Sequence, residues 1–106
     1  MIRFLNPLGV LKEVFEQEYP DYNCEVHFVE NQKNSLGETF FPDDGGDPII
    51  QIGAEKTIPQ MLDIMAHELA HVVAGITAEH GKEWENIYNN IYKVYQYRMG
   101  IREKKT

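Results

Sequence analysis

One segment of this chain, TIPQMLDIMAHELAHVVAG at residues 57–75, constrains the fold more than any other. Apolar side chains fall on nearly every side of a helix drawn through it, which predicts a helix enclosed by other elements. Thr57 and Gln60 form a capping-box pattern with Pro59 in the first turn, and Gly75 is suited to end the helix. Ionisable side chains on such a helix are costly to bury unless they find partners.

Five other elements are predicted around this central helix, and the chain of 106 residues is the size of one domain. The predicted order is a helix, a strand, a hairpin of two short strands joined by PDDGGD, the central helix and a last helix. The last helix carries an aromatic and aliphatic stripe that we expect to pack against the central helix and the sheet. We therefore predict a single α+β domain over residues 1–106, with an N-terminal helix, a short mixed sheet of about three strands, the central helix and a C-terminal helix. The flanking elements are expected at residues 7–19, 25–30, 37–41, 47–52 and 81–99.

Composition narrows the class of protein. A formal net charge of −7 opposes binding to nucleic acid by this chain alone and to anionic membranes. No stretch reaches the roughly 20 apolar residues of a membrane span, and the N-terminal residues lack a leader-like apolar region, so we expect a cytoplasmic protein. Cys24 is the only cysteine, which excludes an internal disulfide and a cysteine-rich zinc site and favours a small core residue.

The central helix carries a pattern typical of a zinc site. His67 and His71 stand four residues apart, so both rings lie on one face of the helix and can bind one ion. Glu68 follows the first histidine directly, where its carboxylate can reach a zinc-bound water without binding the metal itself. We predict His67 and His71 as zinc ligands and Glu68 as the catalytic base.

A third zinc ligand is predicted by elimination. Of the two remaining histidines, His27 is expected on an exposed strand face, whereas His80 lies just beyond the Gly75 break. We favour His80, with Glu79, Glu83 and Glu85 as the acidic alternatives. Three protein ligands and one water are the arrangement of catalytic zinc, so one Zn²⁺ per chain is expected. Glu68 would then activate the zinc-bound water to hydrolyse a peptide bond.

The motif His67-Glu68-Leu69-Ala70-His71, followed by His80-Gly81-Lys82-Glu83-Trp84, resembles the SprT-like group of zincin metallopeptidases. The resemblance covers about residues 57–91 and implies a minimal zincin-like catalytic core. By it, His67, His71 and His80 are zinc ligands and Glu68 is the general base. The basic surface or cysteine-ligated zinc ribbon that accompanies DNA-associated members is missing from this sequence, so DNA-dependent proteolysis is not carried over.

The predicted partner is a protein or peptide substrate, and the sequence makes no prediction of oligomeric state. An edge strand above a zincin site pairs with extended substrate, and we expect residues 47–52 to be that strand. The alternatives are a non-catalytic zincin-fold interaction module, a small gluzincin-like peptidase with a glutamate as third ligand, and a hydrolase of non-peptide amides. One tyrosine of the last helix could steady an oxyanion, although core packing is favoured for each of Tyr88, Tyr92, Tyr95 and Tyr97.

Overall fold

The strands form a mixed sheet in which a parallel and an antiparallel pair share the central strand. The computed structural model describes residues 6–30, 37–75 and 81–100, and the sheet order there is β1-β3-β2. β3 pairs with β1 in parallel and with β2 in antiparallel orientation. The strands are β1 (Glu25–Val29), β2 (Gly37–Phe40) and β3 (Ile49–Gly53). The predicted hairpin and the mixed sheet are confirmed.

Three helices accompany the sheet in the described part of the chain, which confirms the predicted α+β class. Asn6 caps the first helix by accepting hydrogen bonds from the backbone N–H groups of Leu8 and Gly9, and Pro7 occupies its first turn. The helices are α1 (Pro7–Glu18), α2 (Ile58–Ala74) and α3 (Lys82–Met99).

Local interactions define where α2 begins and where it ends. The Thr57 hydroxyl accepts from the Gln60 N–H at 3.3 Å, and the Gln60 side chain accepts from the Thr57 N–H at 2.9 Å, so the predicted capping box is formed. At the other end Gly75 has φ 99° and ψ 160°, a backbone conformation that is essentially restricted to glycine. These contacts set the bounds of α2 at Ile58 and Ala74.

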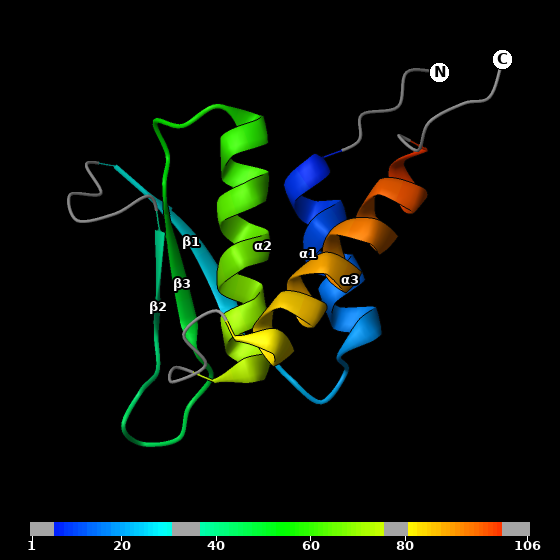
Figure 1. Ribbon diagram of the computed structural model, residues 1–106. Helices are drawn as coiled ribbons and strands as arrows, with labels where there is room; N and C mark the ends of the chain where they lie inside the picture. The colour runs from blue at the N-terminus through cyan, green and yellow to red at the C-terminus, as the bar shows by residue number, and fades with distance from the viewer. Residues whose placement is uncertain (1–5, 31–36, 76–80, 101–106) are drawn as a thin grey trace, which may run out of the picture.

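α2 is the middle layer of the molecule. It lies between the sheet on one side and the pair α1 and α3 on the other, as Figure 1 shows. Its contacts with strands are to β2 and β3. Enclosure from both sides explains why α2 is apolar nearly all round. The core side chains with no exposed surface come from all three layers and include Leu11, Phe15, Ile50, Ile52, Leu69 and Ile91.

Two expectations about packing are wrong. In the described residues α3 contacts α1 and α2 and makes no close backbone contact with a strand, because α2 fills the space beside the sheet. The strand within residues 47–52 is β3, which is central, so the edge strand next to α2 is β2 instead. An apolar stripe on a helix, or an alternating pattern in a strand, predicts which side chains are buried. It does not predict which element covers them.

The N-terminal part of the sheet is mostly as expected. Cys24, just before β1, is buried, and burial raises the pKa of its thiol from 9.0 to about 11. His27 is exposed, as predicted, and its Nε2 lies 2.9 Å from Oε1 of Glu25. Phe28, the next residue and on the opposite strand face, is also exposed, at 44 %. No helix among the described residues combines the length and the apolar character needed to cross a membrane.

Candidate metal and active site

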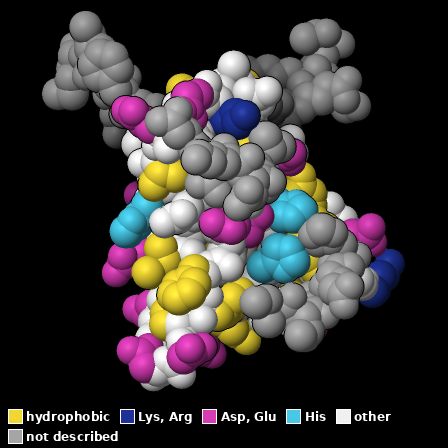
Figure 2. Space-filling view, turned by 90° about the vertical axis from the view of Figure 1, so that its left-hand side faces the viewer, with side chains coloured by type: hydrophobic (Ala, Val, Ile, Leu, Met, Phe, Trp, Pro, Cys, Tyr) yellow, Lys and Arg dark blue, Asp and Glu magenta, His cyan; other side chains and the backbone are white. Residues whose placement is uncertain are grey.

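The two histidines of the central helix lie next to each other. His67 and His71 are one helical turn apart on α2, and their ring centroids are separated by 5.3 Å. Both side chains are partly exposed, and Figure 2 shows neighbouring histidines with acidic side chains beside them on the sheet side of the molecule. The pair predicted from the sequence is therefore adjacent and accessible to an ion.

Glu68 differs from every other charged residue in the described part of the chain because it is buried, at 8 % exposure. Its Oε1 accepts a hydrogen bond from the Thr39 hydroxyl at 2.6 Å, and its Oε2 lies 4.0 Å from Nε2 of His67. A buried carboxylate is costly to desolvate, and a short hydrogen bond to a charged group offsets part of that cost. Thr39 is thus the partner that the buried carboxylate requires.

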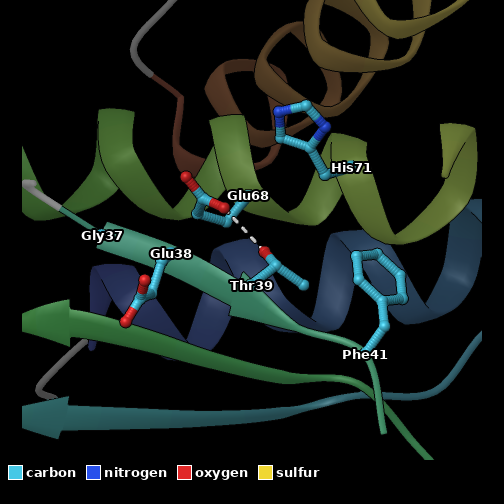
Figure 3. Close-up of a pocket in the computed structure, with 6 residues that line it drawn as sticks. All are labelled: Gly37, Glu38, Thr39, Phe41, Glu68 and His71. Carbon is cyan, nitrogen blue, oxygen red and sulfur yellow. Dashed lines mark hydrogen bonds between the residues drawn. The ribbon is translucent and has the colours of Figure 1, made fainter. Parts of the chain in front are cut away.

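A cleft of about 220 Å³ lies between β2 and α2. The carboxylate of Glu68 and the ring of His71 approach it from the helix, and the strand contributes the opposite wall (Figure 3). The cleft is lined by Gly37, Glu38, Thr39, Phe41, Glu68 and His71. Two of the sequence-predicted site residues therefore share a cavity with the edge of the sheet.

Trp84 connects the third helix to the histidine pair. Its ring centroid lies 4.8 Å from that of His67 and 5.8 Å from that of His71. Its indole N–H donates to the backbone carbonyl oxygen of His67 at 3.2 Å. The first turn of α3 is consequently held beside both imidazoles.

Tyr88 continues this aromatic contact away from the cleft. Its ring stacks on Trp84 with centroids 5.1 Å apart, and its hydroxyl donates a short hydrogen bond to the Asp63 carboxylate. Burial, followed by the hydrogen bond to Asp63, raises the Tyr88 pKa far above its ordinary value. Burial is also the first cause of the raised pKa values of Tyr92 and Tyr95. The described contacts agree with core packing for these three tyrosines, whereas Tyr97 is 64 % exposed.

Two of the four candidates for the third zinc ligand lie within the described residues, and two lie outside them. His80 and Glu79 lie outside the described residues. Glu83 and Glu85 are exposed on α3, and Glu85 lies 3.8 Å from the Lys82 ammonium group. Within residues 6–30, 37–75 and 81–100, no three histidine, cysteine, aspartate or glutamate side chains gather into a metal-binding group. Neither Glu83 nor Glu85 therefore joins His67 and His71 in such a group.

Two side chains, Thr39 and Trp84, contact the predicted site residues in a way that the sequence did not predict. Thr39 alternates with Gly37 and Phe41 along one strand face, and this spacing is the only local signal for it. Trp84 belongs to the aromatic stripe of the last helix and to the motif that resembles SprT-like peptidases, but neither pattern predicted its contact with the histidine pair. Their contacts with Glu68 and His67 join residues 29 and 17 positions apart, and such pairings depend on the tertiary fold.

Comparison of the chain with protein-family models, with curated proteins and with solved structures finds no match in any of the three. The side chains of the cleft and the chemistry that they can perform therefore indicate what the protein does.

Proposed function

We propose that this protein is a zinc-dependent peptidase of the SprT-like zincin type. One observation carries the proposal: a buried glutamate faces a cleft directly beside two histidines spaced to bind one ion. Core packing alone gives no reason to bury a carboxylate here, since burial of an ionised group is unfavourable. A general base at the bottom of a substrate cleft does give such a reason.

The residues present fit a zinc ion by the chemistry of their donor atoms. Imidazole nitrogens are common zinc ligands, and the two rings on α2 are adjacent and partly exposed. His67, His71 and His80 would hold the ion. Support for His80 comes from its sequence position, one residue before Gly81, the N-cap of α3, and from Trp84 in the first turn of α3, which contacts both imidazoles.

The reaction that we propose is hydrolysis of a peptide bond. Zinc, when bound, supplies a Lewis acid that polarises the substrate carbonyl and lowers the pKa of water. Glu68 accepts a proton from the attacking water and then passes it to the leaving amine, so its carboxylate is regenerated at the end of the cycle. The low exposure of Glu68 keeps bulk water away from the carboxylate during this transfer.

An extended protein or peptide segment is the substrate that suits the cleft. β2 is an edge strand of the sheet and forms one wall of the cavity that contains Glu68 and His71. An extended chain can add to such an edge through backbone hydrogen bonds. In this respect β2 replaces the strand at residues 47–52 that the sequence suggested, and the carbonyl to be attacked would lie near Glu68.

Zinc analysis and a point substitution test the proposal together. Purified protein should retain about one zinc per chain after dialysis, as measured by elemental analysis, and should cleave members of a mixed peptide library. Glu68→Gln should retain the metal and lose cleavage, while His71→Ala and His80→Ala should lose most of the metal. Cleavage by Glu68→Gln at the wild-type rate would contradict the mechanism. Metal binding without cleavage by the wild type would instead favour the interaction module, and cleavage restricted to small amides would favour the non-peptide hydrolase.

A further inference from the structure

Thr39 contacts the proposed general base from a different element of the fold. Its hydroxyl lies 2.6 Å from Oε1 of Glu68 and donates to it, joining β2 to α2. The threonine is half-buried and the glutamate is buried, so this hydrogen bond is largely shielded from water. Hydrogen bonds to charged acceptors are shorter and stronger than those between neutral groups.

The close approach of β2 to α2 gives this hydrogen bond its geometry. A Cβ atom added at Gly37 would lie 2.5 Å from Cγ2 of Ile64, which means that the strand is too near the helix for any side chain there. The same Cβ would lie 3.8 Å from Cγ of Glu68, so the glutamate side chain runs alongside Gly37. Figure 3 shows the Glu68 carboxylate turned toward Thr39, the next residue on that strand face.

We propose that Thr39 is a positioning residue that sets the orientation of the Glu68 carboxylate for proton transfer. This inference rests on the proposed function. By donating to Oε1, the hydroxyl limits rotation of the carboxylate and leaves Oε2, on the side of His67, to accept the proton from water. Geometry of this kind matters because a general base must lie within hydrogen-bond reach of the proton it removes.

A merely structural threonine would behave differently from a positioning one. Valine has nearly the same shape as threonine and would fill the same space, but it cannot donate a hydrogen bond. Serine keeps the hydroxyl and loses only a methyl group. Thr39→Val tests the loss of the hydrogen bond that orients the carboxylate. Thr39→Ser tests the loss of side-chain packing on the strand.

The kinetic test compares these variants on the peptide that the wild type cleaves fastest in a mixed library. Thr39→Val is expected to lower kcat about 10- to 100-fold, with KM changed by less than about twofold, because substrate binding does not need the hydroxyl. Thr39→Ser is expected to restore kcat to within about threefold of the wild type. Phe28→Leu, at an exposed position on β1 and away from the cleft, is the matched control and should keep the wild-type kcat.

A second readout uses metal-free protein and needs no activity. In protein labelled with carbon-13 at glutamate carboxyl groups, the Glu68 resonance, assigned with Glu68→Gln, should move in Thr39→Val and stay near its wild-type position in Thr39→Ser. Unchanged kcat in a folded Thr39→Val variant, or an unmoved Glu68 resonance, would overturn the inference while the peptidase proposal stands. A wild-type protein that cleaves no peptide would overturn the proposed function, and the positioning role would fail with it.

Discussion

Trp84 donates its indole N–H to the backbone carbonyl oxygen of His67, 3.2 Å away, and so ties the start of α3 to the middle of α2. The same ring contacts both imidazoles of the proposed zinc site. One side chain therefore serves as a link between two helices and as a wall that restricts the histidine rings.

Trp84→Phe should weaken both roles, because phenylalanine has no N–H donor and presents a smaller ring to the two imidazoles. Loss of one hydrogen bond is expected to lower the free energy of unfolding by about 1 kcal/mol, measured by urea denaturation of metal-free protein. Looser support of the ligand rings is expected to weaken zinc binding about 10-fold, measured by competition with a chelating dye. Equal stability and equal zinc affinity in Trp84→Phe and the wild type would show that the contact is incidental.

Zinc should stabilise the folded protein if His67 and His71 bind it. At zinc concentrations about 100 times the dissociation constant, ligand binding adds about 2.7 kcal/mol, which corresponds to a rise in Tm of roughly 10 °C for a domain of this size. His71→Ala should abolish the rise. His27→Ala removes an exposed histidine on β1 and is the matched control, which should respond like the wild type. An equal shift in His71→Ala would assign the stabilising site to other residues.

Gly37→Ala should push β2 away from α2. The added methyl group would meet Cγ2 of Ile64 at 2.5 Å and the backbone oxygen of Gln51 at 3.1 Å, and overpacking of this kind costs about 1–3 kcal/mol. Because Ile64→Ala removes the nearer atom, the cost of Gly37→Ala should be smaller in that background. A double-mutant cycle by urea denaturation measures this coupling, and strictly additive effects would contradict the close approach.

Alkaline pH should destabilise the protein through its buried acidic groups. The Cys24 pKa is raised by burial from 9.0 to about 11, so the unfolded chain loses this proton first as pH rises. The contribution is fully present below pH 9.0 and is lost on approach to pH 11, by about 2–3 kcal/mol. Denaturation curves between these pH values should show a shallower decline for Cys24→Ala. A Cys24→Ala curve parallel to the wild-type curve would contradict the assignment.

The ends of the helices were the part of the fold most open to prediction from sequence. The Thr57 and Gln60 capping box and Gly75 act locally, and each lies at the end of α2 where the sequence predicted it. The adjacency of His67 and His71 follows from helix geometry alone and was equally accessible.

The order of the layers could not be predicted in the same way. The α3 stripe indicated a buried face, but only the fold reveals that α1 and α2, and no strand in the described residues, cover it. The hydrogen bond between Thr39 and Glu68 likewise depends on β2 being the edge strand beside α2, which strand periodicity does not encode.

The burial of Cys24 has a practical consequence at the bench. As the only cysteine, shielded and protonated near neutral pH, it has little tendency to oxidise or to cross-link one molecule to another. The protein can therefore be purified and stored without mercaptoethanol or dithiothreitol. Because thiolates are strong zinc ligands, leaving these reductants out removes the competitor that would otherwise distort every metal titration.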